Sequence, residues 1–176
     1  DRERHKKRID EIRASGARVR LVSDGDLMPG IATAIRGSGT HVVMGAGGSG
    51  EAVLTAAAMK VLGGKILARL VLPNVANGES EEKIAEEKKE KMPRLATMGI
   101  TEDSIDDVMD TNKLVPGNAV IFAATGITPG QLLREVNLFG GGDARVHSVS
   151  MGSSGVVKFT DTLYVSDKEE TPIRFM

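Results

Sequence analysis

The sequence of 176 residues predicts a single α/β domain. Helix-like and strand-like segments alternate along the first two-thirds of the chain, which is the pattern of a sheet covered by helices. Short apolar segments separated by glycine turns fill the last third, which is typical of antiparallel strands at one edge of that sheet. A chain of this length buries roughly 70% of its unfolded surface, so it can form a core without a disulfide or a metal.

In the first third, two helices alternate with two strands. Residues 2–15 are predicted to form a helix, because Ile9 and Ile12 have apolar helical spacing and Gly16 follows as a C-terminal stop. The next predicted elements are a strand, a helix ended by a glycine-serine-glycine turn, and a short apolar strand, at residues 17–23, 28–36 and 41–45.

The middle of the chain predicts two more helices around a buried strand. Residues 52–62 are strong helix formers stopped by two glycines, and residues 65–72 form an apolar strand closed by Pro73. The acidic residues 79–97 predict a long exposed helix, in which Pro93 removes a backbone donor and is expected to kink or break it. Residues 108–114 give no clear pattern.

Residues 118–124 carry the strongest strand pattern in the chain, and Thr125 and Gly126 end it. Three further segments alternate like antiparallel strands joined by glycine turns: 136–139, 146–151 and 156–165.

Composition excludes several classes of protein. The 23 basic and 24 acidic residues give a net charge of −1, which excludes a strongly basic nucleic-acid binder. The absence of cysteine excludes a disulfide framework, a cysteine-ligated zinc and a cysteine nucleophile. No apolar run reaches the length of a membrane span, and the charged start predicts an internal part of a larger protein without a signal peptide.

Residues 1–20 hold eight basic groups against four acidic ones, a local excess that could face an anion. Residues 79–113 hold eleven carboxylates and six bases, which is typical of a solvated helix face.

A glycine run at residues 45–50 follows an apolar strand and opens a helix, an arrangement that turns free backbone N–H groups toward an anion. The run matches G-x-G-x-x-G, but a dinucleotide site needs an acidic residue about 20 positions later. Residues 52–78 contain none. A phosphate or sugar-phosphate cradle and a packing-only tight turn are therefore both favoured over a dinucleotide site.

Glu51 stands in the first helical turn after these glycines. The carboxylate could simply complement the helix dipole. Beside a phosphate, however, the same charge would repel the ligand unless a cation lay between them, which suggests a metal that bridges Glu51 and a phosphoryl oxygen.

Two other short motifs could bind the same ligand. Asp24, Gly25 and Asp26 follow a predicted strand end, where carboxylates can accept sugar hydroxyls or hold Mg²⁺ or Mn²⁺, although such a sequence also forms an ordinary turn. Arg2 and Arg4 are close enough to fork around one phosphate, although basic residues at a helix start are more often solvated surface.

These motifs together resemble class II fructose-1,6-bisphosphatases. The resemblance is carried, in the family's order and spacing, by residues 2–5, 17–21 with 24–26, 44–48 with Glu51, 122–128 and 147–148. It runs through essentially the whole chain, which is similar to the C-terminal half of that enzyme. It implies the layered αβαβα sandwich of the lithium-sensitive sugar and inositol phosphatase superfamily, and an N-terminal half that brings most of the acidic metal ligands.

The resemblance also implies a role for each residue. Glu51 matches a metal ligand and Gly48 a substrate-contacting backbone position, and the segment from Asp24 to Asp26 matches the part that touches the sugar hydroxyls. Arg2, Glu3 and Arg4 match the segment that holds the substrate. The family usually has proline where Glu3 and Gly50 stand, and Pro29 is unusual after the Asp-Gly-Asp segment.

The expected activity is metal-dependent hydrolysis of the 1-phosphate of fructose 1,6-bisphosphate, with Mn²⁺ or Mg²⁺, in cytoplasmic gluconeogenesis. Sedoheptulose-1,7-bisphosphatase activity is an alternative, as is a non-catalytic domain that binds a sugar phosphate or a dinucleotide. The expected partners are a sugar bisphosphate, the missing N-terminal half and further copies in a homo-oligomer, with neither nucleic acid nor membrane.

Overall fold

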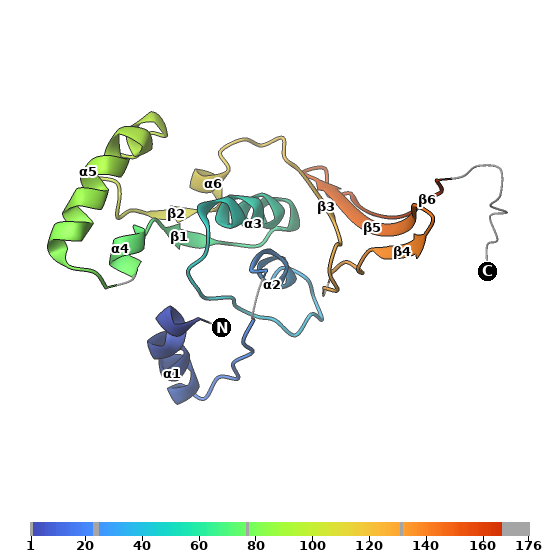
Figure 1. The fold of residues 1–176 in the computed structure, drawn as a ribbon, viewed down its shortest axis with the longest axis horizontal. Helices are drawn as coiled ribbons and strands as arrows, with labels where there is room; N and C mark the ends of the chain where they lie inside the picture. The colour runs from blue at the N-terminus through green and yellow to red at the C-terminus, as the bar shows by residue number, and fades with distance from the viewer. Residues whose placement is uncertain (1, 23–24, 77, 131, 167–176) are drawn as a thin grey trace.

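The computed structural model describes residues 2–22, 25–76, 78–130 and 132–166. Helices and strands are interspersed along these residues, which confirms the predicted α/β class. Figure 1 shows an elongated arrangement, with helix α5 at one end, the sheet of strands β3 to β6 at the other, and helices α2 and α3 between them.

The larger sheet has four antiparallel strands, β3 (Ile121–Thr125), β4 (Asn137–Gly140), β5 (Asp143–Gly152) and β6 (Val157–Tyr164). Strand β6 pairs with β5 along most of its length, and β3 and β4 pair with its two ends. Because a strand has only two hydrogen-bonding sides, β3 and β4 share the side opposite β6. The predicted antiparallel strands of the last third are confirmed, with boundaries shifted by a few residues.

A carboxylate ties the strands of this sheet together. Asp161 on β6 accepts hydrogen bonds from Nε and Nη2 of Arg145 on β5, both at 2.8 Å. Arg134 Nη2 donates to the same carboxylate, also at 2.8 Å. The hydrogen bonds from Arg145 hold the pKa of Asp161 below its usual value. The ionised carboxylate therefore stabilises the β5–β6 pair and the segment before β4.

The core lies between this sheet and two helices, α2 (Leu27–Ala32) and α3 (Ser49–Leu62). The two helices approach closely at Gly30, where an added Cβ would stand 2.9 Å from Cγ2 of Thr55. The buried side chains come from both helices, the sheet and the segment before β4: Ile31, Ala58, Met59, Phe122, Leu133, Val149 and Met151. This packing fixes α3 against the sheet, and the predicted stop is confirmed because Gly63 ends α3 with φ of 72°.

A second, smaller sheet pairs β1 (Leu67–Arg69) with β2 (Val108–Asp110), antiparallel. Helix α6 (Thr111–Leu114) follows β2, and Lys60 of α3 donates from Nζ to the carbonyl of Val115 at 2.7 Å. The predicted strand at residues 65–72 is therefore confirmed over three residues only. The segment 108–114, which had no clear pattern, provides its partner strand.

Helices α4 (Pro73–Ala76) and α5 (Glu81–Thr97) follow the small sheet. The predicted long acidic helix is confirmed, but it does not break at Pro93, which lies inside it. Its acidic face is solvated except at Glu87, which accepts a hydrogen bond from the backbone N–H of Asn74 at 2.8 Å. An ion pair with Lys91 lowers the pKa of the Glu87 carboxyl, which keeps the buried group charged.

The first predicted helix is also confirmed. A 3₁₀ turn, η1 (Glu3–His5), leads into α1 (Lys6–Ala14), and Gly16 follows the helix with φ of 83°. The helix predicted over 28–36 begins one residue earlier and ends at Ala32, where turns replace it.

Two strand predictions of the first third are wrong. The described part of 17–23, residues 17–22, and residues 41–45 are irregular, whereas residue 23 lies outside the described residues. Val42 and Met44 are 65% and 62% exposed. A strand requires a neighbour that exchanges backbone hydrogen bonds with it, and neither sheet of the described ranges includes residues 17–22 or 41–45. Apolar β-branched residues favour an extended backbone locally, but this preference does not bring a second strand alongside.

Candidate functional site

The glycine loop, residues 45–48, leads directly into α3. Gly48 is the N-cap of α3, and its carbonyl accepts the first helical hydrogen bond, from the N–H of Ala52 at 3.3 Å. The N–H groups of the first turn of any α-helix lack intrahelical acceptors, and Gly48 has no side chain that could cap them. The core packing of α3 thus presents a positive helix end at this loop.

Two residues of the N-terminal turn form hydrogen bonds with the loop at Ala46. Arg4 donates from Nη2 to the carbonyl of Ala46 at 2.6 Å. The N–H of Ala46 donates to Nε2 of His5 at 2.9 Å. Both backbone polar groups of Ala46 are therefore satisfied by consecutive side chains from a segment some 40 residues away in sequence.

The His5 ring accepts a hydrogen bond at Nε2, so the ring is neutral with its proton on Nδ1. Burial lowers the pKa of His5, and the positive charges of Arg4 and Arg8 lower it further. His5 therefore stays in the state that can hold the loop at neutral pH.

Two carboxylates lie against the next two residues of the loop. A Cβ added to Gly47 would overlap Oδ2 of Asp26, and one added to Gly48 would overlap Oε2 of Glu51. Only glycine lets both carboxylates lie this close to the loop backbone. The loop thus carries carboxylates on two adjacent residues, with an arginine and a histidine on the residue before them.

Asp26 reaches the loop because the chain turns just before α2. Gly25 has φ of 76°, a conformation that L side chains rarely adopt, and Asp26 is the N-cap residue of α2. The side chain of Asp26 makes no capping hydrogen bond to α2, and it lies instead beside Gly47. Asp24, predicted as part of this motif, lies outside the described residues.

The remaining predicted residues, Arg2 and Glu3, are exposed at the N-terminal turn. The carbonyl of Arg2 accepts from the N–H of His5 at 2.9 Å, so Arg2 belongs to the turn that carries the His5 ring. The carboxylate of Glu3 stands 3.7 Å from Nζ of Lys6. The acidic residue between the two arginines is therefore directed to its own helix.

A metal would find hard oxygen donors at this site. Carboxylate oxygens are the ligands that Mg²⁺ and Mn²⁺ prefer, and Asp26 and Glu51 supply them on adjacent glycines. Among the residues that the structure describes, no group of three or more His, Asp or Glu is placed to hold an ion. The donor chemistry fits a divalent cation, but these residues would provide only part of its coordination shell.

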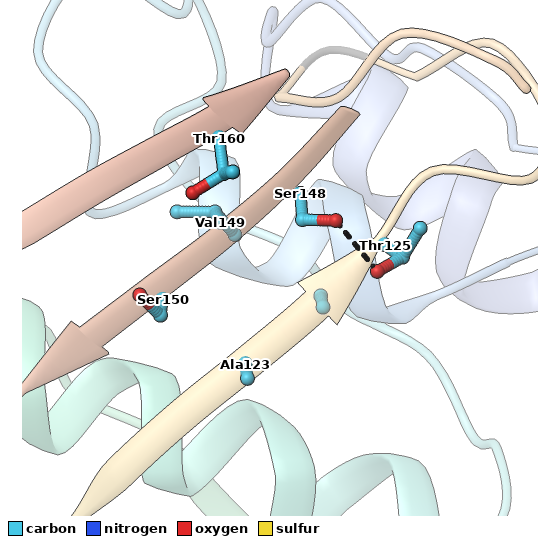
Figure 2. Close-up of a pocket in the computed structure, with 7 residues that line it drawn as sticks. Ala123, Thr125, Ser148, Val149, Ser150 and Thr160 are labelled. Carbon is cyan, nitrogen blue, oxygen red and sulfur yellow. Dashed lines mark hydrogen bonds between the residues drawn. The ribbon is translucent and has the colours of Figure 1, made fainter. Parts of the chain in front are cut away.

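A hollow among the described residues lies elsewhere, on the face of the large sheet opposite the core. Its volume is about 290 Å³, and it is lined by small side chains of β3, β5 and β6. Figure 2 shows the Thr125 and Ser148 hydroxyls directed at each other across β3 and β5, and these oxygens are 2.8 Å apart. No charged group lines the hollow, so it lacks the chemistry that a phosphate ligand requires.

The structure brings three sequence-predicted motifs to one loop: the N-terminal turn through Arg4, the Asp-Gly-Asp segment through Asp26, and Glu51. Sequence reasoning missed His5 as a site residue. The signal was present, because His5 follows Arg4 directly in the same motif, but a lone histidine gives no hint that it will meet a backbone N–H 41 residues away.

Comparison with known proteins gives a consistent result. The family model described as "Bacterial fructose-1,6-bisphosphatase, glpX-encoded" matches residues 1–164. A protein of Synechococcus elongatus named D-fructose 1,6-bisphosphatase class 2/sedoheptulose 1,7-bisphosphatase is 44% identical over 173 residues, which are 97% of this chain. Proteins with the same name are 42% identical over 97% of this chain in Trichodesmium erythraeum and 41% over 95% in a Synechocystis strain.

The matched part is 48% of the Synechococcus elongatus and Trichodesmium relatives and 47% of the Synechocystis one. The chain therefore spans about half the length of these curated relatives. Within the described ranges, no helix has both the length and the apolar character to cross a bilayer. The match over residues 1–164 takes in the N-terminal turn, the Asp-Gly-Asp segment and the glycine loop alike, and it shows that this chain belongs to the glpX-encoded family of bacterial fructose-1,6-bisphosphatases.

Proposed function

We propose that this chain forms the substrate-binding half of a metal-dependent phosphatase that hydrolyses the 1-phosphate of fructose 1,6-bisphosphate. The observation that carries the proposal is the meeting of Arg4, Asp26 and Glu51 at one glycine loop. A turn that served packing alone would have no need for two carboxylates and a guanidinium on three consecutive residues.

The phosphate-binding part of the proposal rests on the loop and on Arg4. The unpaired N–H groups of the first turn of α3 and the helix dipole attract an anion. Arg4 uses one N–H on the Ala46 carbonyl, and its guanidinium has further donors for a phosphate oxygen. Arg2 adds a second positive charge on the same turn.

Glu51 is proposed as the metal ligand of this half of the enzyme. Its carboxylate is exposed and folds back over Gly48, so it can bind a cation without breaking the core. A bound Mg²⁺ or Mn²⁺ would neutralise phosphate charge and lower the pKa of a coordinated water. The other ligands are proposed to come from the N-terminal half, since one exposed glutamate cannot hold the ion alone.

The sugar-binding part of the proposal rests on the segment from Asp24 to Asp26. Gly25 has a positive φ directly before Asp26, and the Asp26 carboxylate can accept hydrogen bonds from sugar hydroxyls. Gly48 is proposed as a backbone contact to the substrate beside it.

Sedoheptulose 1,7-bisphosphate is a second proposed substrate, since the names of the cyanobacterial relatives carry both activities. Both sugars carry a phosphate and neighbouring hydroxyls, which are the groups that the loop and Asp26 are proposed to bind. We further propose a cytoplasmic, gluconeogenic role and a homo-oligomeric enzyme.

The test measures phosphate release from fructose 1,6-bisphosphate with Mn²⁺ and with Mg²⁺. This chain is expressed alone and, in parallel, joined to the N-terminal half of the Synechococcus elongatus relative. The joined protein is expected to release phosphate, whereas this chain alone is expected to have little or no activity because its metal site is incomplete. Measurement with sedoheptulose 1,7-bisphosphate gives the preference between the two substrates.

Two results would contradict this proposal. A joined protein that folds and binds the bisphosphate without releasing phosphate would support the alternative of a non-catalytic anion-binding module. Full turnover by this chain alone would show that the ligand set is complete without another half.

A further inference from the structure

The glycine loop has few supports of its own. Residues 41–45 before it form no strand, so no ladder fixes the backbone as it enters the loop. The loop is exposed except at Ala46, which is half-buried. The direction of its N–H groups must therefore be set by the contacts of individual residues.

His5 provides such a contact in two ways. Its Nε2 accepts from the N–H of Ala46 at 2.9 Å, and its ring lies over the preceding residue, where a Cβ added to Gly45 would stand 3.5 Å from Cε1. Arg4 completes the grip through the Ala46 carbonyl, at 2.6 Å. The backbone N–H and carbonyl of Ala46 are thus fixed immediately before Gly47 and Gly48, the two glycines beside which the carboxylates of Asp26 and Glu51 lie.

We propose that His5 is a positioning residue: it accepts the hydrogen bond of the Ala46 N–H and thereby holds the Gly47–Gly48 backbone in the conformation that binds phosphate. Arg4 acts on the substrate as well as on the loop, but His5 acts only through the loop. We call the hydrogen bond from the Ala46 N–H to Nε2 of His5 the clamp. The identity of the ligand rests on the proposed function, whereas the clamp does not.

The clamp makes the loop sensitive to pH. A protonated imidazole has no lone pair at Nε2, so the Ala46 N–H would lose its acceptor. The lowered pKa of His5 keeps the ring neutral at pH 7, and the clamp is lost only as the pH falls below the ordinary histidine value of 6.5. Arg4, the amino terminus of this chain and Arg8 are the positive charges that act on the ring. The two arginines do not titrate in this range, and the amino terminus is replaced by a peptide bond in the joined protein.

Two substitutions separate the acceptor from the ring. His5→Gln keeps an acceptor oxygen near the position of Nε2, whereas His5→Phe keeps an aromatic ring but removes the acceptor. His41→Phe is the matched control, because His41 is an exposed histidine in the segment before the loop. All three are made in the chain joined to the N-terminal half.

The first readout is hydrogen exchange of peptides that cover residues 43–51, without ligand. At pH 7, the Ala46 amide is expected to exchange about tenfold faster in His5→Phe than in the unsubstituted protein, because one hydrogen bond is lost. In His5→Gln, the exchange rate of this amide is expected to stay within about twofold of that in the unsubstituted protein. As the pH falls from 7 through the lowered pKa of His5, loop protection corrected for intrinsic exchange should fall in the unsubstituted protein and stay constant in His5→Gln.

The second readout is steady-state kinetics with fructose 1,6-bisphosphate. His5→Phe is expected to raise KM about tenfold with a smaller change in kcat, and His5→Gln should restore the original KM. A purely structural histidine would lower the melting temperature of both variants without this separation.

The outcomes decide the clamp and the proposed function separately. Equal loop exchange in His5→Phe and His41→Phe would overturn the clamp, as would a loss of protection in His5→Gln equal to that in His5→Phe. If the loop responds as expected but the unsubstituted protein releases no phosphate, the clamp stands and the proposed function fails.

Discussion

The buried middle and the first turn of helix α3 belong to regions that are held in different ways. Its buried middle packs Ala58 and Met59 against Phe122 and Val149 of the large sheet, in a core shared with α2. Its first turn meets the glycine loop, which is exposed and is held by the side chains of Arg4 and His5. One region depends on apolar burial and paired strands, and the other on a few polar contacts.

Along this single helix, the residues that stabilise the fold are therefore different from those proposed to bind the ligand. Substitutions in the sheet are expected to lower the free energy of unfolding, because they create cavities, overlaps or broken ion pairs. Substitutions at the loop change groups that are already solvated, so they are expected to alter ligand binding with little change in stability. Each substitution below tests this separation in the chain joined to the N-terminal half of the Synechococcus elongatus relative.

The largest effect is expected for Glu51→Gln. If Glu51 holds the metal, loss of its charge should lower kcat by about a hundredfold or more, the range for removal of one key electrostatic group. The melting temperature should not fall, since the side chain is exposed. The matched control is Glu82→Gln in the first turn of α5, which should leave both values unchanged. Normal kcat in Glu51→Gln would reduce Glu51 to a residue that complements the helix dipole.

Gly126→Ala tests the other region. A Cβ at this position would overlap the backbone carbonyl of Arg134, which cannot rotate away as a side chain can. We expect a loss of about 2 kcal/mol, typical of overpacking, and a melting temperature lower by about 5 °C in calorimetry. Gly117→Ala is the control, because a Cβ there meets nothing within 4 Å. An unchanged melting temperature would mean that Gly126 does not lie this close to the Arg134 backbone.

Gly48→Ala should affect the loop with little loss of stability. The added Cβ would displace the Glu51 carboxylate, the flexible end of a side chain, rather than the backbone. We expect kcat/KM to fall about tenfold, a modest loss of transition-state stabilisation. The comparison is Gly50→Ala, where a Cβ meets open space. Equal kcat/KM in the two variants would show that the position of the Glu51 carboxylate does not matter.

Asp161→Asn gives the sheet a pH-dependent test. The hydrogen bonds from Arg145 hold the pKa of Asp161 low, so its contribution to stability is present above the ordinary aspartate pKa of 3.8 and is lost as the pH falls through the lower folded value. Denaturant titration should therefore find the variant less stable at pH 7, with the difference disappearing in strong acid. Asp10→Asn, at an exposed ion pair with Arg13, should show no such dependence.

The smallest effect is expected for Glu3→Pro. The Glu3 carboxylate is 89% exposed and pairs only loosely with Lys6, at 3.7 Å. KM for the bisphosphate should change less than twofold, because an exposed ion pair of this kind contributes little. A large gain in affinity would show that Glu3 intrudes on the phosphate that the neighbouring arginines are proposed to bind.

How far the site could be predicted differs from residue to residue. Glu51 and the glycines were identified because a strand-like segment, a glycine run and a helix follow one another in the sequence. This local pattern is typical of an anion-binding site. Asp26 and Arg4 were identified from their motifs, but their meeting at Gly47 and Ala46 was not. His5 was missed because its partner is a backbone N–H, which has no signature in the sequence.

The sequence by itself determined the elements whose causes are local. The α3 helix follows from strong helix formers and the two glycines that stop it, and the antiparallel strands β4 to β6 follow from apolar segments joined by glycine turns. Gly63 adopts its left-handed conformation for the same local reason.

Only the tertiary structure decided which segments pair and what the loop touches. Residues 41–45 have the same apolar character as β3 but form no strand, because strand formation depends on a neighbour that local sequence does not specify. Residues 108–110 carry no strand pattern and nevertheless pair with β1. The contact of His5 with Ala46 likewise depends on how two distant segments pack, since a hydrogen bond across 41 residues requires the fold that brings its donor and acceptor together.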